Sequence, residues 1–177
     1  MKRILILLLA LSLTGCASLT KPISSKGEVI DCASVKHIAV KNGDTVLNCL
    51  TGSEKISIES LRGPLIVNVW GSWCGPCADE IPLFVEFHHH ANDKVKILGI
   101  AVEEAKPQNA KDFIVNHGML WPNLYDAKGL TRSTFGMGVP VTWFIDKSGT
   151  VTHKHIGVIK STEELIDLTA KYLKVSI

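Results

Sequence analysis

The sequence lacks a surplus of charge of either sign. Its 177 residues include nineteen Lys and Arg and seventeen Asp and Glu, a formal net charge of +2 at pH 7. Two of the cations, Lys2 and Arg3, stand at the extreme N-terminus, and without them seventeen cations face seventeen acids. A chain with balanced charge has no basic surface to hold phosphates, so we predict that it does not bind nucleic acid.

Aromatic residues are also scarce, at 6% of the chain, and the sequence contains no internal repeat. Hydrophobic residues make up 46% and charged residues 20%. These values are ordinary for a globular protein and exclude wholesale disorder. The length suits one compact domain better than two.

The N-terminal apolar run is too short to cross a membrane. It covers residues 4–13, whereas a spanning helix needs roughly 20 apolar residues. A short run behind two cations is typical of a signal peptide, which we place at residues 1–15.

The run ends in LTGC at residues 13–16, which resembles a bacterial lipobox. In such sequences cleavage precedes the cysteine, here Cys16, whose sulfur carries the lipid. The alternative is an ordinary secretory signal in which Cys16 has no role. Two acyl chains give stable anchoring where one is marginal. We therefore expect a lipid-anchored protein on the extracytoplasmic face of a bacterial cell membrane, where disulfides persist.

Residues 16–31 are rich in Ser, Thr, Lys and Pro and show no apolar periodicity. This composition predicts a flexible tether, followed by one domain at residues 32–177. In that domain short β-rich segments alternate with amphipathic ones. The predicted strands are 35–40, 56–58, 65–70, 95–102, 141–146 and 151–156, and the predicted helices are 60–62, 76–90, 107–117, 127–135 and 161–173. This order predicts an α/β fold whose central mixed sheet is covered by helices on both faces.

The chemistry is concentrated in WGSWCGPCADEIP, at residues 70–82. It places a Cys-X-X-Cys where a strand meets a helix. Cys74 falls at the helix N-terminus, where free backbone N–H groups and the helix dipole lower the pKa of a thiol. Cys77 lies one turn further in and can resolve a mixed disulfide on Cys74. A structural zinc site would need a second Cys or His pair at metal spacing, and none follows, so we predict no metal.

Together with GVPVTWFID at residues 138–146, this string resembles the membrane-tethered thioredoxin-like proteins of the TlpA/ResA family, most closely their lipoprotein members from actinobacteria. The resemblance covers roughly residues 32–175. It implies a thioredoxin-like fold with an insertion between the active-site helix and the proline loop, within residues 99–137. It also implies thiol-disulfide oxidoreductase activity with Cys74 and Cys77 as the redox pair and no further cofactor.

The resemblance also assigns residues to the contact with a bound client protein. Pro140 matches the family's cis-proline, packed against the dithiol. The backbone groups of Val139 would pair with a client peptide strand, and Trp73 would form part of the contact surface beside Cys74. The cis form of an X–Pro bond costs only about 0.5–1 kcal/mol.

Glu80 matches the acidic residue that many family members carry three positions beyond the second cysteine. A partly buried carboxyl there could hold or relay the proton of Cys77. The alternative is an early-helix acid that only faces the helix dipole. Asn68 occupies the position of thioredoxin's buried acid and cannot carry a proton, so acid–base duty passes to Glu80, water or another group.

Cys32 and Cys49 complete the five cysteines and are 17 residues apart. A bridge between them would stabilise the domain by roughly 3 kcal/mol. One lipidated, two catalytic and two structural cysteines would then account for all five. The alternatives are a second redox pair that relays electrons to Cys74 and Cys77, or two free thiols.

Two histidine groups invite a metal interpretation. His88, His89 and His90 are consecutive, so on a helix they point about 100° apart and cannot converge on one ion. His153 and His155 share one face of a strand but have no third ligand nearby. We predict a solvated helix end and a surface strand rather than metal sites.

Two functions from different classes follow. The first is an enzyme that exchanges disulfides in exported proteins, for example during cytochrome c maturation or disulfide repair, and receives electrons from a membrane thiol donor. The alternative is a thioredoxin-fold copper carrier that uses Cys74 and Cys77 as soft ligands. Such carriers usually add a His or Met near the thiols, and Met137 is the only candidate here.

Overall fold

The computed structural model describes residues 26–40, 45–136 and 138–177. The predicted signal peptide, Cys16 and Met137 lie outside these ranges. The strands are β1 (Val46–Cys49), β2 (Lys55–Ser57), β3 (Leu65–Trp70), β4 (Lys96–Val102), β5 (Asn123–Asp126), β6 (Val141–Ile145) and β7 (Val151–Ile156). The helices are α1 (Gly75–Ala91), α2 (Pro107–Asn116), α3 (Arg132–Phe135) and α4 (Thr162–Leu173), with a 3-10 turn η1 (Ile58–Ser60).

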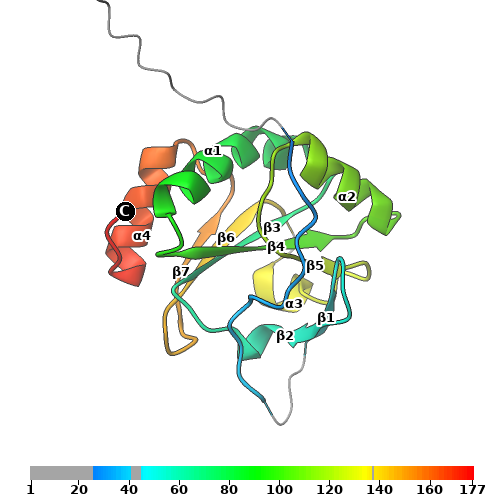
Figure 1. The fold of residues 1–177 in the computed structure, drawn as a ribbon, viewed down its shortest axis with the longest axis horizontal. Helices are drawn as coiled ribbons and strands as arrows, with labels where there is room; N and C mark the ends of the chain where they lie inside the picture. Colours follow the sequence, from blue (N-terminus) through cyan, green and yellow to red (C-terminus); the bar gives the residue numbers. More distant parts are fainter. Residues whose placement is uncertain (1–25, 41–44, 137) are drawn as a thin grey trace, which may run out of the picture.

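One seven-stranded mixed sheet forms the centre of the molecule, in the order β2-β1-β5-β4-β3-β6-β7 (Figure 1). The pairs β3–β4 and β4–β5 are parallel, and the other four pairs are antiparallel. Apolar residues of α1, α2 and α4 pack on one face, and α3 and the β1–β2 hairpin contribute to the core on the other. The predicted α/β fold, with helices on both faces of a mixed sheet, is confirmed.

Strand β3 is the centre of this arrangement because all six of its residues are buried. Ile66 and Trp70 pack into the core beneath α1, whereas Val67 and Val69 pack into the core on the opposite face. This alternation follows from the two-residue period of a strand. Because β3 is fully buried, it holds the segment that follows it, residues 71–74, in a fixed position at the start of α1.

The segment 35–40, predicted as a strand, does not form one. Only His37 makes an isolated bridge, to Leu61. The side chain of Ile38 remains 46% exposed, which shows that the alternating apolar residues of this segment do not all pack against the sheet. The prediction of a strand here was wrong.

Residues 27–30, which composition assigns to the predicted tether, contact the domain through their backbone. The N–H groups of Gly27 and Glu28 donate to the carbonyls of Val115 and Met119, at 2.9 and 3.0 Å. Ile30 forms a parallel bridge with Pro122. The hydrogen-bonded part of the chain thus begins before Cys32.

Helix α4 begins with a capping box formed by a Ser and a Glu three residues later. Ser161 is the N-cap, and its hydroxyl oxygen accepts from the N–H of Glu164 at 3.1 Å. The carboxylate of Glu164 in turn accepts from the N–H of Lys160 at 2.8 Å. Across the described ranges, no helix combines the length and the apolar content needed to span a bilayer.

Candidate active site

The two active-site cysteines form a disulfide at the start of α1. Cys74 is the N-cap of the helix, and its sulfur accepts from the N–H of Cys77 at 3.2 Å. The two Cα atoms are 5.3 Å apart. Cys74 keeps 5% of its surface exposed, whereas Cys77 is fully buried. An N–H group directed at the sulfur of Cys74 favours the thiolate form of this residue after reduction.

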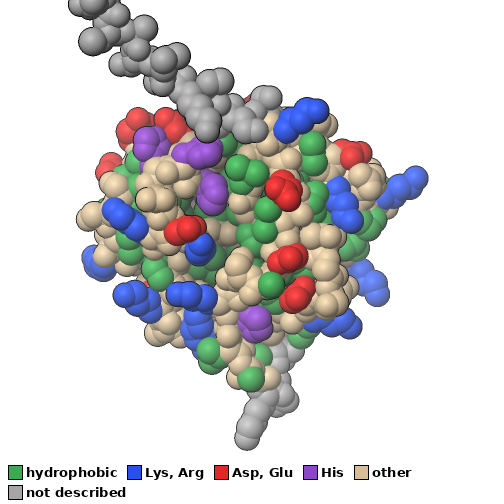
Figure 2. All heavy atoms as spheres, in the orientation of Figure 1, with side chains coloured by type: hydrophobic (Ala, Val, Ile, Leu, Met, Phe, Trp, Pro, Cys, Tyr) green, Lys and Arg blue, Asp and Glu red, His purple; other side chains and the backbone are tan. Residues whose placement is uncertain are grey.

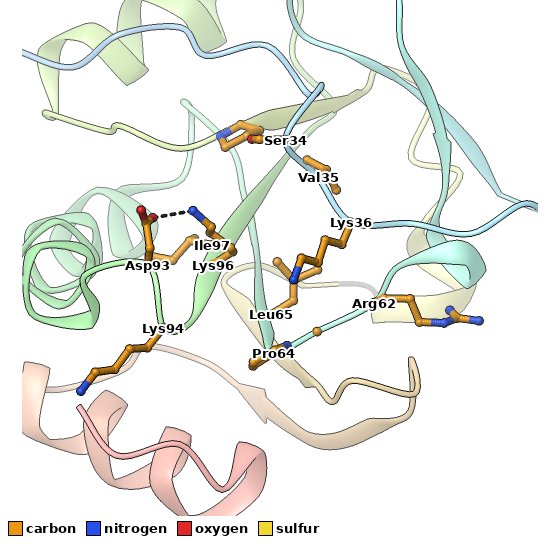
Figure 3. A pocket seen from close by; sticks show the side chains of 12 residues that line it. Ser34, Val35, Lys36, Arg62, Pro64, Leu65, Asp93, Lys94, Lys96 and Ile97 are labelled. Atoms are coloured by element: carbon orange, nitrogen blue, oxygen red, sulfur yellow. Dashed lines mark hydrogen bonds and ion pairs between the residues drawn. The ribbon is translucent and has the colours of Figure 1, made fainter.

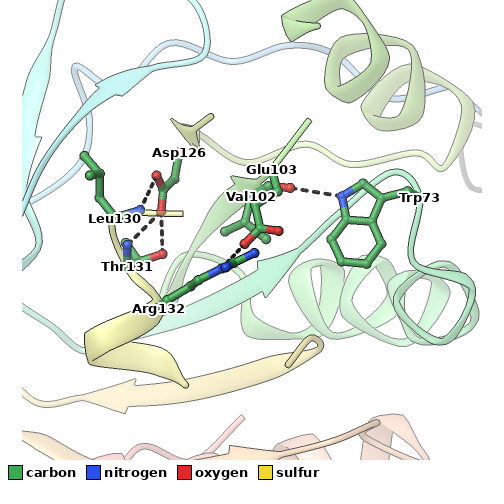
Figure 4. A network of polar contacts seen from close by, with 7 residues as sticks. All are labelled: Trp73, Val102, Glu103, Asp126, Leu130, Thr131 and Arg132. Carbon is green, nitrogen blue, oxygen red and sulfur yellow. Dashed lines mark hydrogen bonds and ion pairs between the residues drawn. The ribbon is translucent and has the colours of Figure 1, made fainter. Parts of the chain in front are cut away.

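The segment that leads into Cys74 is fastened to the end of β4. The carboxylate of Glu104 accepts from both the N–H and the hydroxyl of Ser72, at 2.5 and 2.6 Å. The indole N–H of Trp73 donates to the carbonyl of Val102 at 3.2 Å (Figure 4). These bonds fix the backbone before the nucleophile while the ring of Trp73 stays 56% exposed. Glu104 is a site residue that the sequence analysis missed, because nothing local marks a contact 32 residues away.

The Val139–Pro140 peptide bond is cis, as the resemblance implies. The carbonyl oxygen of Val139 lies 3.8 Å from the sulfur of Cys74. The carbonyl of Pro140 accepts from the N–H of Gly157 at 3.0 Å, which ties the loop to the end of β7. Ile156, next to this contact, is 80% exposed. Trp73, next to Cys74, and Ile156, beside the end of the proline loop, are thus both exposed apolar side chains. A second cis bond, Gly63–Pro64, was not predicted.

Glu80 points from α1 into the core and has no exposed surface. Its two carboxylate oxygens accept from the side-chain amide of Asn68 at 2.8 Å and from the N–H of Ile159 at 3.1 Å. Burial is the largest influence and raises the pKa of Glu80 to about 7, although both hydrogen bonds act in the opposite direction. The alternative of an acid that faces the helix dipole is wrong, because the first turn of α1 contains no acid.

A hollow beside Trp73 continues the site toward α3. Its walls include Val69, Val102 and Phe135, and it reaches Val139 of the proline loop. Its rim carries an ion pair between Glu103, at the end of β4, and Arg132 of α3. This pair contributes no net charge (Figure 4).

The start of α3 is fixed by a buried acid. The carboxylate of Asp126 accepts from the N–H groups of Leu130 and Thr131 and from the Thr131 hydroxyl, at 2.7–2.8 Å. These bonds hold the segment from β5 to α3 against the sheet, and with it one wall of the hollow beside Trp73.

A second hollow lies at the N-terminal ends of β3 and β4, away from the dithiol (Figure 3). Lys36 points into it, and Lys96 pairs there with Asp93. Arg62 and Lys94 also line it but point outward. Because Cys74 follows the opposite end of β3, this hollow is not part of the redox site.

Cys32 and Cys49 form a disulfide with Cα atoms 5.9 Å apart. The alternative of two free thiols is therefore wrong. Both sulfurs lie near the carbonyl oxygen of Asn123, at 3.8 and 3.6 Å. The side-chain oxygen of Asn123 accepts from the indole N–H of Trp70 at 3.0 Å, and a Cβ atom at Gly99 would overlap that oxygen. Asn123 thus connects the bridge to the strand that carries the active site.

The histidines make ordinary surface contacts. His90 pairs with Glu86 one turn earlier on α1, at 3.7 Å. His153 stacks on Tyr172 with ring centroids 4.0 Å apart. Within the part of the chain that the structure describes, no group of three His, Cys, Asp or Glu side chains could hold a metal ion. Figure 2 shows cationic and acidic side chains interspersed over one face of the molecule.

A disulfide between a helix N-cap and the next turn, beside a cis-proline loop on a mixed α/β sheet, defines a thioredoxin-like thiol-disulfide oxidoreductase. The chain belongs to the AhpC/TSA family, whose model matches residues 36–154. It is a thiol-disulfide oxidoreductase of the ResA and DsbE type.

Three similar proteins illustrate this relationship. The chain is 31% identical to thiol-disulfide oxidoreductase ResA of Bacillus thuringiensis, over 64% of this chain and 66% of ResA. It is 32% identical to thiol:disulfide interchange protein DsbE of Pseudomonas fluorescens biotype C, over 68% and 67%. The match thus spans about two thirds of either relative. The crystal structure of StoA from Bacillus subtilis superposes with a TM-score of 0.56 at 28% identity, over 69% of this chain and 94% of StoA. The resemblance to actinobacterial lipoproteins stays a prediction.

Proposed function

We propose that this protein reduces or exchanges disulfides in exported proteins while a lipid on Cys16 holds it at the extracytoplasmic face of the cell membrane. Cytochrome c maturation and disulfide repair are two processes that need this reaction. The observation that carries the proposal is the placement of Cys74. Its sulfur caps α1 and accepts from the N–H of Cys77, and Cys74 keeps 5% of its surface exposed, whereas Cys77 is fully buried.

The reaction starts with both cysteines reduced. The thiolate of Cys74 attacks one sulfur of a client disulfide, the client's S–S bond breaks, and its second sulfur leaves as a thiolate that takes up a proton. Cys77 then loses its proton and attacks the sulfur of Cys74. The Cys74–Cys77 disulfide forms as the mixed disulfide between Cys74 and the client breaks, and the released client sulfur takes up a proton, so the client leaves as a dithiol. Two electrons pass from protein to client, so a membrane thiol donor must reduce the protein again, and no further cofactor takes part.

Glu80 serves as the proton acceptor or donor for Cys77 in this scheme. It lies three residues beyond Cys77, one turn along the same face of α1. Because burial brings its pKa to about 7, the carboxyl is available in both protonation states near neutral pH. A carboxyl with an ordinary pKa would rarely be protonated under these conditions.

The client surface comprises Trp73, Val139 and Pro140. The Val139 carbonyl lies beside the sulfur of Cys74, so a client strand that pairs with the Val139 backbone would bring its own disulfide to that sulfur. The apolar hollow between Trp73 and Val139 would receive a neighbouring side chain of the client.

The reduction potential tests the direction of electron flow. A strongly oxidising disulfide needs extra positive charge to stabilise its thiolate. The first turn of α1 contains Gly75 and Pro76 but no cation, and the next charged residues are Asp79 and Glu80. We expect a potential below about −200 mV, nearer thioredoxin at about −270 mV than an oxidase at about −120 mV. Equilibration of the full chain with a dithiothreitol or glutathione series measures it. A value near −120 mV, with Cys74 still ionised at pH 4, would establish a direct oxidase instead.

Location is tested by a substitution at the predicted lipid site. Cys16→Ser removes the sulfur that would carry the lipid, so we expect the protein to lose membrane association or to remain unprocessed. Membrane fractionation and the mass of the mature chain measure both effects. Ala17→Ser, at the neighbouring residue, is the matched control and should behave as the wild type. Normal processing with unchanged membrane association in Cys16→Ser would exclude the anchor.

A further inference from the structure

A nearly buried carboxylate at the end of β4 holds one residue of the segment before the nucleophile by two donors. The oxygens of Glu104 accept separately from the N–H and the hydroxyl of Ser72, at 2.5 and 2.6 Å. Glu104 keeps only 4% of its surface exposed. A carboxylate withdrawn from water needs such donors, and hydrogen bonds to a charged acceptor are roughly twice as strong as those between neutral groups. The contact therefore attaches Ser72 firmly to the end of β4.

Ser72 belongs to a compact turn that ends at Cys74. The N–H of Cys74 donates to the carbonyl of Gly71 at 3.0 Å, which closes the turn. The ring of Trp73 packs back on Gly71, where a Cβ atom would lie 2.7 Å from two ring atoms. Trp73 is attached to β4 through its side chain alone, whereas Glu104 also binds a backbone N–H of the turn. Glu104 thus fixes the backbone of the turn relative to the sheet.

The position of this turn sets the position of the Cys74 sulfur. Cys74 is the N-cap of α1, and its backbone is extended, with φ −93° and ψ 103°. The preceding turn, and not the helix, therefore directs this residue. Its sulfur accepts from the N–H of Cys77 at 3.2 Å, a contact that favours the thiolate after reduction. A displaced turn would carry the sulfur away from that N–H and from the positive end of the helix dipole.

The backbone at the end of β4 directs two neighbouring acids to opposite sides. β4 lies between β3 and β5 in the sheet. The carboxylate of Glu103 pairs with Arg132 of α3, which follows β5 (Figure 4). The carboxylate of Glu104 reaches Ser72, which follows β3. Between the two contacts, Glu103 has a φ of +54°, in the left-handed region that residues other than glycine rarely adopt. Such conformations persist where their surroundings fix them, and they cluster at functional sites.

We propose that Glu104 is a positioning residue for the nucleophile: through Ser72 it holds the sulfur of Cys74 at the N-terminus of α1, where the thiolate is stabilised. Glu104 acts on the turn and transfers no proton itself. The inference rests on the role proposed above for Cys74 as the attacking thiol.

The charge of Glu104 acts in the opposite direction to its hydrogen bonds. A carboxylate near a thiolate repels it and raises the pKa of the thiol, whereas a sulfur held at a helix N-terminus has a lowered pKa. Of the other charged groups nearby, Glu103 is paired with Arg132, and Asp79 follows on α1. The hydroxyl of Tyr125 donates to the backbone carbonyl of Glu104, at 3.5 Å. Substitution of Glu104 alone leaves these groups in place, so it can separate the two effects.

The test measures the pKa of Cys74 in the reduced full chain, from the pH dependence of its alkylation by iodoacetamide. Mass spectrometry of peptides identifies the modified cysteine. Glu104→Ala removes both bonds to Ser72, so the pKa of Cys74 should rise by about one pH unit, which slows alkylation near neutral pH about tenfold. Glu104→Gln removes the charge but keeps both contacts, because its oxygen accepts from the N–H and its NH₂ group donates to the hydroxyl. It should keep the wild-type pKa.

Ser72→Ala tests the route of the effect. It removes the hydroxyl bond and leaves the N–H bond, so the pKa of Cys74 should rise by less than in Glu104→Ala. In Ser72→Ala/Glu104→Ala the pKa should equal that of Glu104→Ala, because the hydroxyl has already lost its partner. Fully additive effects would exclude Ser72 as the route.

An unchanged or lowered pKa of Cys74 in Glu104→Ala would overturn the proposal, and a lowered pKa in Glu104→Gln as well would show a direct effect of the charge instead. Should Glu104→Ala fail to fold, Ser72→Ala decides, and an unchanged pKa there overturns the proposal. Faster alkylation of Cys77 than of Cys74 in the wild type would refute the attacking role of Cys74 and this proposal with it. The other outcomes refute this proposal alone.

Discussion

Cys77→Ala should convert the protein into a covalent trap for its clients. Cys74 can still attack a client disulfide, because it caps α1 and keeps part of its surface exposed. The mixed disulfide then persists, because the buried thiol that would resolve it is absent. Multiple turnover should fall to the rate measured without protein. Nonreducing electrophoresis and mass spectrometry would reveal the adducts and identify the clients.

Cys74→Ala is the matched control for this experiment. It should abolish turnover without accumulating adducts, because the remaining thiol of Cys77 is buried. In the reduced wild type, alkylation near neutral pH should modify Cys74 much faster than Cys77. Adducts on Cys77, or equal alkylation rates, would reverse the two roles. Stoichiometric copper uptake by the wild type, without catalysed reduction of any disulfide protein, would favour the copper carrier.

Removing the second disulfide should cost about 3 kcal/mol of the free energy of unfolding. The bridge between Cys32 and Cys49 closes a loop of 17 residues and thereby restricts the unfolded chain. The double variant Cys32→Ala/Cys49→Ala should therefore unfold at a temperature lower by about 6–12 °C, given the size of the domain. Urea unfolding under oxidising conditions, followed by circular dichroism, measures the difference.

Cys74→Ala/Cys77→Ala provides the comparison for stability. The bridge that it removes joins residues only 3 positions apart and should contribute about half as much to the free energy of unfolding. The variant Cys32→Ala/Cys49→Ala should retain catalysed disulfide reduction at temperatures at which it is folded. Retained fold with lost turnover would establish a second redox pair that relays electrons to Cys74. Unchanged stability would show that the bridge has no structural role.

The sequence predicts the long strands of the sheet well and two of its short strands poorly. Strand β3 is recognisable because an apolar run, here with a single Asn, is typical of a strand buried on both faces. β1 and β5 were missed because each has only four residues, and Asn occurs in both. The helix predicted over 127–135 shrinks to α3, since Asp126 holds the preceding residues in a turn. Short elements depend on their tertiary partners, which local sequence does not encode.

The same distinction applies to the site. Cys74 and Cys77 are evident from their spacing and from the strand and helix around them. The burial of Glu80 and its contact with Ile159, 79 residues away, cannot be recognised in the sequence. Glu104 shows no pattern at all, although it fixes Ser72 beside the nucleophile. Long-range contacts of single polar side chains emerge only from the packing of the whole domain.

The two disulfides lie on opposite sides of the sheet, and only one of them is the redox pair. Cys74 and Cys77 belong to the core on one face, and Cys32 and Cys49 belong to the core on the other. A molecule that cleaves disulfides carries in its own chain a bond of the kind it attacks, and another copy of the same protein could therefore act on it. Cys32 is fully enclosed, whereas Cys49 keeps 7% of its surface exposed, so a thiolate of another copy could approach this bond only at the sulfur of Cys49. Burial of Cys32 thus limits, on one face of the sheet, the exchange reaction that the disulfide on the other face is built to carry out.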